Sequence, residues 1–65
     1  MDKETALAIV SSKLALIIAN HRKDAVKYSS LVQYSAEAEE RIIEAATVLG
    51  IGSDVLHKAN LLTNN

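Results

Sequence analysis

Side chains with catalytic potential are few in this chain and lie scattered along it. The histidines His21 and His57 stand far apart, and neither has the acid–base or metal-ligand spacing that catalysis or metal binding requires. Cysteine is missing, which excludes a thiolate nucleophile, a disulfide and a thiolate zinc site. The serine pairs at 11–12 and 29–30 have no base beside them. We therefore expect a protein that is not an enzyme and needs no cofactor, metal ion or small-molecule substrate.

Four glutamates lie close together at positions 37, 39, 40 and 44. Carboxylate oxygens are the ligands that hard cations prefer, so a cation site is one interpretation of this group. The other is a solvated acidic face near the start of a helix, where negative charge is favourable. We adopt the second interpretation, because such runs are common on exposed helices.

The small size of the chain poses a stability problem. It has 65 residues, 49% of them hydrophobic, and a formal net charge of -1. A core in a domain below about 70–80 residues rarely supplies more than about 3–5 kcal/mol, and a disulfide, a metal ion or self-association usually adds the rest. Since the first two are not expected here, we predict a homo-oligomer, with a dimer favoured.

No segment has the features of a membrane span or a secretory signal. The apolar stretch 5–19 is shorter than the roughly 20 residues that a spanning helix needs, and Lys13 interrupts it. Residues 1–4 lack the positive charge of a signal peptide. We expect this stretch to be a buried helix, and the protein to be cytoplasmic.

The elements that must position these residues are helices. Neither Gly nor Pro occurs before Gly50, and good helix formers dominate. We predict one all-α domain over residues 1–65, with helices at about 3–28, 31–49 and 54–62. Asp2 is the expected N-cap of the first helix, Ser30 (with Gln33) or Ser35 that of the second, and Ser53 that of the third. Gly50 suits the left-handed position that ends a helix.

One stripe of the first helix carries apolar residues at steps of three and four, which is the helical period. This helix is also apolar on more than one side, so one short partner helix does not cover it. We predict that the stripe packs against a second copy or a partner protein. Its members are Leu7, Val10, Leu14, Ile17, Ile18, His21 and Tyr28.

His21 is the polar member of this stripe. We interpret it as a partly buried histidine that bonds a nearby carboxylate such as Glu37. The alternative is a polar residue that sets the register of a self-associating bundle.

A helical hairpin with its turn near residues 29–30 gives a consistent pairing. It places Ile17 near Ile42, and the basic residues Arg22 and Lys23 near the acidic residues 37–40. In this single register, apolar residues of one helix face apolar residues of the other, and basic residues face acidic ones. The alternative is a single unbroken helix over residues 2–49, which no helix breaker forbids.

Residues 42–59 resemble the helix-turn-helix of bacterial DNA-binding proteins. A small residue, an apolar residue, a glycine and an apolar residue bracket the turn in that motif, and they are here Ala46, Leu49, Gly50 and Ile51. The resemblance implies DNA contacts by Ser53, His57 and Lys58. The net charge of -1 and the acidic Asp54 beside these positions weigh against DNA as the ligand.

Two functions of different classes follow from these patterns. The first is a small non-enzymatic regulatory protein that forms a homodimeric helical bundle. It would bind or inhibit a protein partner through an apolar helical face. The alternative is a small helix-turn-helix transcriptional regulator that uses residues 42–59.

Overall fold

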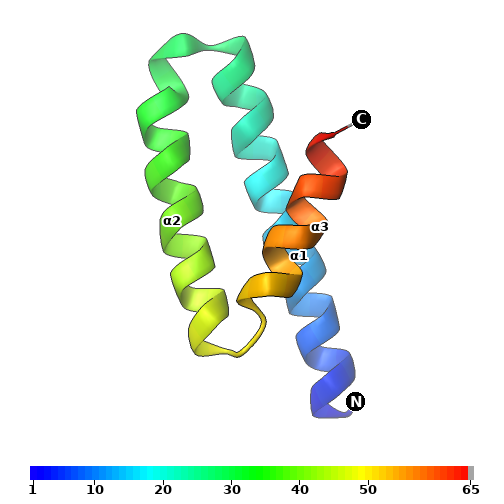
Figure 1. Cartoon of the computed structure of the whole chain (residues 1–65). Helices are drawn as coiled ribbons and strands as arrows, with labels where there is room; N and C mark the ends of the chain where they lie inside the picture. Colours follow the sequence, from blue (N-terminus) through cyan, green and yellow to red (C-terminus); the bar gives the residue numbers. More distant parts are fainter. Residues whose placement is uncertain (65) are drawn as a thin grey trace.

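The computed structural model describes residues 1–64, and these form three α-helices (Figure 1). The helices are α1 (Lys3–Lys27), α2 (Val32–Val48) and α3 (Gly52–Thr63), with the short 3-10 helix η1 (Ser29–Leu31) between α1 and α2. No strand occurs in this part of the chain. The all-α prediction is confirmed, and the helix ends agree with the predicted ones to within two residues. Residue 65 of the predicted domain lies outside the described residues.

The hairpin prediction is confirmed, and the alternative of one long helix is wrong. At Tyr28 the backbone leaves the helical region, with φ -127° and ψ 103°, and α2 then runs back along α1 (Figure 1). At the other end, Asp2 is the predicted N-cap, since its Oδ1 accepts a hydrogen bond of 2.6 Å from the backbone N–H of Thr5.

The N-caps predicted for α2 and α3 are wrong. At the start of α2 the chain continues directly from η1, whose Leu31 N–H donates to Tyr28 O at 2.9 Å, so no serine side chain caps it. Ser35 lies buried within α2 instead. Ile51, rather than Ser53, precedes α3, and its carbonyl accepts from Val55 N at 3.0 Å. No side chain caps the first turn of α2 or of α3.

Gly50 has the predicted left-handed conformation, with φ 78°. This conformation is rarely adopted by residues with a Cβ atom, so glycine is required where the chain turns from α2 to α3. The following Ile51 N–H donates to Ala46 O at 2.9 Å and ties the turn to the end of α2.

Small side chains make up most of the core. Of the buried apolar residues among 1–64, only Ile18 and Val55 are larger than alanine. The rest are Ala15, Ala19, Ala38, Ala46 and Ala59. Alanine lets helix backbones approach closely, but it buries little apolar area, and burial is what stabilises a core. Many larger aliphatic side chains lie outside this core, as described below.

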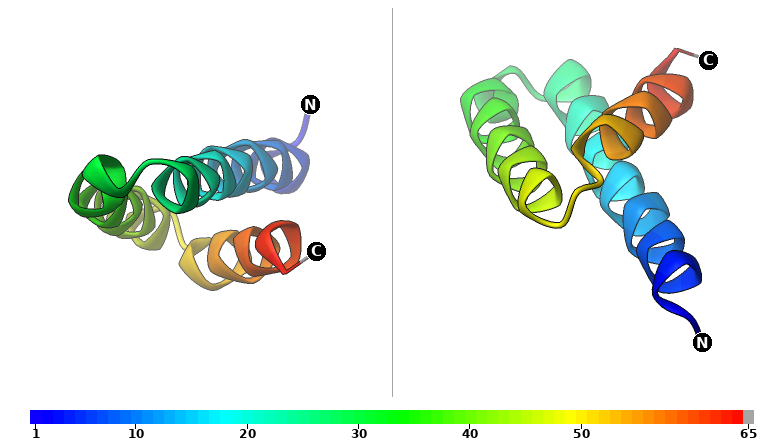
Figure 2. Two further views of the ribbon diagram at one scale, coloured as in Figure 1. Left: turned by 90° about the horizontal axis from the view of Figure 1, so that it is seen from above. Right: turned by 60° about the horizontal axis from the view of Figure 1, so that its bottom comes forward.

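The arrangement of helices is open on one side. Figure 2 shows α3 packed against one side of the α1–α2 hairpin, with no helix on the opposite side. The N-terminal part of α1 also extends past the turn between α2 and α3 (Figure 1). Within residues 1–64, no helix is both long enough and apolar enough to pass through a membrane.

Candidate interaction surfaces

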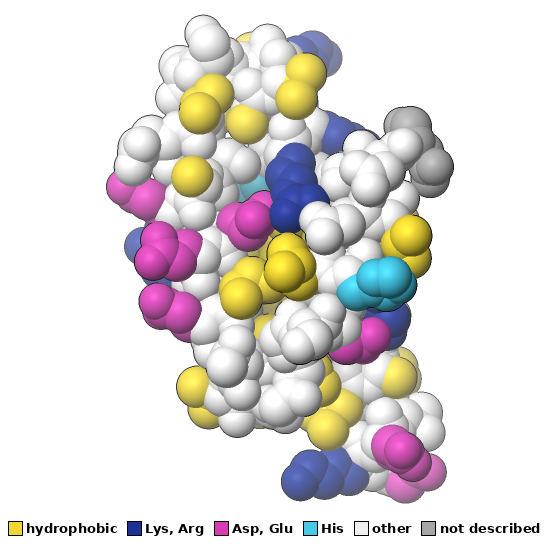
Figure 3. Space-filling model, in the orientation of Figure 1, with side chains coloured by type: hydrophobic (Ala, Val, Ile, Leu, Met, Phe, Trp, Pro, Cys, Tyr) yellow, Lys and Arg dark blue, Asp and Glu magenta, His cyan; other side chains and the backbone are white. Residues whose placement is uncertain are grey.

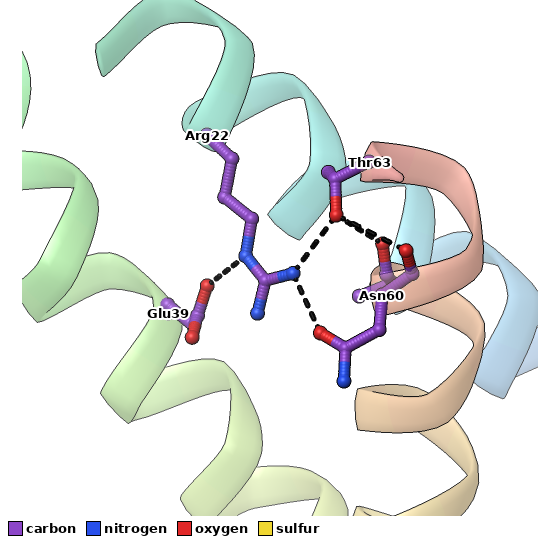
Figure 4. Close-up of polar contacts among 5 residues, drawn as sticks. Arg22, Glu39, Asn60 and Thr63 are labelled. Atoms are coloured by element: carbon purple, nitrogen blue, oxygen red, sulfur yellow. Dashed lines mark hydrogen bonds and ion pairs between the residues drawn. The ribbon is translucent and has the colours of Figure 1, made fainter. Parts of the chain in front are cut away.

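Arg22 of α1 joins all three helices through its guanidinium group (Figure 4). Its Nε donates to Glu39 Oε1 of α2 at 2.6 Å, and its Nη1 donates to Asn60 Oδ1 of α3 at 2.8 Å and to Thr63 Oγ1 at 3.1 Å. The bond to Glu39 raises the pKa of Arg22 further above its usual value. The predicted contact between Arg22 and the acidic residues 37–40 is confirmed.

The register of the hairpin differs slightly from the predicted one. A turn centred between residues 29 and 30 places Arg22 opposite Glu37, whereas the structure pairs it with Glu39. Glu37 instead accepts a bond of 2.9 Å from Gln33, one turn earlier on α2. Asn60 and Thr63 are partners that sequence reasoning missed, because no pattern in the chain shows how α3 lies against α1.

A second polar contact ties α3 to α1. The hydroxyl of Ser11, which is fully buried, donates to Asp54 Oδ2, and Lys58 Nζ lies 3.0 Å from the same oxygen. The bond from Ser11, followed by that from Lys58, lowers the pKa of the Asp54 carboxyl. Asp54 therefore belongs to the packing of α3 on α1.

The lowered pKa values of Asp2 and Asp54 predict a loss of stability in acid. The Thr5 backbone N–H lowers the pKa of Asp2, as Ser11 lowers that of Asp54. A carboxyl whose pKa is lower when folded stabilises the protein above its unfolded pKa of about 3.9 and loses that effect as the pH falls through the folded value. We expect the urea concentration at the midpoint of unfolding to decrease as the pH is lowered below about 4. In the Asp54→Asn variant this decrease should be smaller. An unchanged acid slope in this variant would contradict the role given to Ser11.

The residues of the predicted partner face have different environments. Ile18 is fully buried in the core between the helices, so its side chain has no surface left for a partner. Leu7, Leu14 and His21 are half-buried. Val10, Ile17 and Tyr28 are exposed, each by more than a third of its surface.

His21 contacts an aromatic ring rather than a carboxylate. Its ring packs edge-on against Tyr34 of α2, with the ring centroids 5.5 Å apart. The predicted bond to Glu37 is wrong, since Glu37 pairs with Gln33. An edge-to-face contact of this kind contributes about 0.5–1.5 kcal/mol.

The exposed residues of this face lie on the side of the hairpin that α3 leaves uncovered. On α1, Arg22 points toward α3, whereas His21, one residue earlier and so rotated by about 100°, contacts Tyr34 on the other side. Val10, Ile17 and Tyr28 share that side with His21 by helical spacing. We call this surface the open face, and its members are Val10, Leu14, Ile17, His21, Tyr28 and Tyr34.

A separate apolar groove lies between α1 and α3. It has a volume of about 390 Å³ and is lined by Ser12, Ala15, Leu16, Lys58, Leu61 and Leu62. Volumes of about 300–1,000 Å³ are usual for binding sites. Leu16 faces this groove and Ile17 faces away from it, so adjacent residues of α1 belong to two different surfaces. Sequence reasoning missed the groove, because it depends on the placement of α3.

In the corner that resembles a helix-turn-helix, Ala46 is fully buried, whereas Leu49 keeps half of its surface exposed. Ser53 and His57 are exposed, but Lys58 is half-buried and pairs with Asp54. Paired in this way, Lys58 has less positive charge to offer a phosphate. DNA binding stays a prediction, and these contacts do not favour it.

The acidic group does not converge on one point. Glu39 pairs with Arg22 and Glu37 with Gln33, and within residues 1–64 no three acidic or histidine side chains gather as metal ligands would. In Figure 3 acidic side chains are spread along the outer edge of α2 and also lie elsewhere on the visible face. No family model matches the chain, and no match is found among curated proteins or solved structures.

Proposed function

We propose that this chain is a non-enzymatic interaction protein that forms a homodimer through the open face and acts by binding, and so regulating, a protein partner. One observation carries the proposal: alanines fill the core while larger aliphatic side chains lie outside. Val10, Ile17 and Leu16 are among the exposed ones. Exposed apolar patches of this kind mark protein–protein contacts.

The dimensions and the accessible surface of the molecule support the proposal that another chain covers part of its surface. Its radius of gyration is 12.1 Å, whereas a compact domain of 65 residues has about 10.7 Å. Its accessible surface is 4593 Å², and a monomer of 7.0 kDa exposes about 4,000 Å². The molecule therefore exposes about 590 Å² more surface than a typical monomer of its mass.

The open face suits a second copy of the chain. Its members lie on α1 and its C-cap, except Tyr34, which lies on the antiparallel α2. A second hairpin placed against this face gives a four-helix arrangement in which the α1 helices supply most of the contact. A two-fold interface uses the same patch on both subunits, and a substitution there acts twice. The aromatic pair His21 and Tyr34 lies within this patch and supplies the large, flat side chains that interfaces favour.

Replacement of Ile17 by Glu tests the dimer. Because two charges enter an apolar interface, we expect the dissociation constant of the dimer to rise at least about tenfold, a change of about 1.4 kcal/mol. Analytical ultracentrifugation from 1 to about 100 µM measures this. The matched control is Leu16→Glu, since Leu16 and Ile17 are both 44% exposed but face different sides.

Two results would contradict the proposal. One is a wild-type protein that sediments as a folded monomer throughout this concentration range. The other is an equal loss of dimer in the Leu16→Glu and Ile17→Glu variants, which would place the interface elsewhere. Far-ultraviolet circular dichroism of each variant shows that the helices are retained.

A further inference from the structure

We infer that the groove between α1 and α3 is the site for the protein partner, and that the partner contributes an amphipathic helix with acidic residues beside its apolar stripe. This inference rests on the proposed function, because it names the surface and the chemistry of the partner that the function requires. Three features of the groove support it: its apolar floor, its length and the charges along its rim.

The floor of the groove is apolar and exposed. Leu16 of α1 and Leu62 of α3 line it, and each keeps more than two fifths of its surface accessible. A smaller hollow of about 140 Å³ also includes Leu62 and continues to Lys23 and Val26. The two hollows therefore follow one another along the α1–α3 seam, with Leu62 lining both.

The combined length of the two hollows fits a short helix. From Ser12 to Val26 they follow α1 for fourteen residues, which corresponds to about 21 Å or four helical turns. A helix laid along them would present apolar residues at i, i+4 and i+7 to the floor. The concave shape favours a helix over a flat lipid surface, because side chains of the helix can enter the hollows.

Most charges beside the groove on α1 are positive, although the acidic Asp24 follows Lys23. Lys13, Leu16 and Lys23 follow each other at three- and seven-residue steps and so lie on one face of α1, and Lys27 continues it. Lys13 and Lys23 are exposed and form no ion pair with another residue of the described chain. Most of the acidic residues of the hairpin lie on α2 instead, away from the groove (Figure 3).

This charge distribution selects an acidic partner. Lysines at the rim attract carboxylates that flank the apolar stripe of an incoming helix and repel a basic helix. Lys58 on the α3 side contributes less, because Asp54 already neutralises much of its charge. We therefore expect Lys23 to make the larger electrostatic contribution.

Two synthetic helical peptides serve as probes. Both carry leucine at i, i+4, i+7 and i+11, and the remaining exposed positions are glutamate in one and lysine in the other. Fluorescence anisotropy with labelled peptides measures the affinity of the full-length protein for each. We expect the acidic peptide to bind at least about tenfold more tightly than the basic one, and more weakly as salt is added.

Variants of the protein locate the peptide. We expect Leu16→Glu to weaken binding of the acidic peptide at least about tenfold, and Lys23→Glu about threefold to tenfold. Ile17→Glu is the control, since it lies on the open face and leaves the groove intact. The Lys23→Glu variant keeps the fold of the protein, because Lys23 is exposed and lies outside the core. It therefore tests the groove even if the Leu16→Glu substitution disturbs α1.

The inference is overturned if the two peptides bind equally, if neither binds, or if Lys23→Glu leaves binding unchanged. It is also overturned if the protein sediments with vesicles of phosphatidylcholine and phosphatidylserine in a Lys23-dependent way while neither peptide binds, since the groove would then face a membrane. A failure of the dimer proposal can be distinguished from a failure of this inference. Analytical ultracentrifugation measures self-association, whereas the peptide titration measures only binding to the groove.

Discussion

Replacement of Ile18 by Ala is expected to lower the free energy of unfolding by about 2–5 kcal/mol. Ile18 is fully buried and belongs to the cluster with Ala15, Ala46, Val55 and Ala59, where the three helices meet. Its fully buried neighbours are mostly alanines, which cannot fill the space that the substitution leaves. The larger side chains that pack against the cluster can fill it only in part; they are Leu14, Ile42, Ile43 and Ile51.

The effect on the folded population is severe because the domain is small. The core of a domain this small rarely supplies more than about 3–5 kcal/mol, so we expect the loss of Ile18 to remove most of the stability of the isolated chain. Urea unfolding followed by circular dichroism measures the change. Ile9→Ala is the matched control, since Ile9 lies on the same helix but is 45% exposed, and its expected cost is below about 1 kcal/mol.

One result would contradict this account of the core. An Ile18→Ala variant as stable as the Ile9→Ala control would show that Ile18 does not hold the helices together.

The helices themselves could be predicted from the sequence, because their signals are local. The Asp2 N-cap, the glycine at position 50 and the run without a breaker each act within one turn of the chain. The hairpin also follows from local chemistry combined with charge, since Arg22 and the acidic residues 37–40 attract each other across it. What the pattern did not predict is the exact register, because Glu37 and Glu39 carry the same charge.

The placement of α3 could not be predicted in the same way. It depends on Ser11, which donates to Asp54, and on Arg22, which reaches Asn60 and Thr63. Each of these polar residues has many possible partners in a linear sequence. The same uncertainty explains why Ile18 was predicted to lie on the partner face although it is buried. The stripe of α1 contains both core and surface residues, and only the position of α3 separates them.

The placement of α3 also decides which surfaces are available. It covers the side of the hairpin that Ala15 and Arg22 share, creates the groove beside Leu16, and leaves Ile17 on the open face. One short helix thus converts the apolar first helix into two separate binding surfaces. Any change that detaches α3 should therefore remove the groove while it leaves the hairpin in place.

Replacement of Arg22 by Met tests this dependence most directly, because the side chain of Arg22 hydrogen-bonds to both α2 and α3 (Figure 4). Methionine keeps most of the apolar stem and removes the guanidinium, so Glu39, Asn60 and Thr63 lose a charged donor. Hydrogen bonds to charged groups contribute about 1.5–3 kcal/mol, and we expect a loss of that size in urea unfolding. Arg22 and Glu39 are each less than a third exposed, so solvent screens this contact only in part.

Arg22→Lys distinguishes geometry from charge. An ammonium group keeps the attraction to Glu39, but it lacks the planar fork that lets Nε face α2 while Nη1 faces α3. We expect it to recover less than half of the stability lost in Arg22→Met, whereas Lys23→Met, at the exposed neighbouring residue, stays within about 0.5 kcal/mol of the wild type. Full recovery by lysine would show that charge alone holds α3 in place. Because the groove exists only while α3 packs on α1, the acidic peptide should bind more weakly to Arg22→Met, even where the helical content is unchanged.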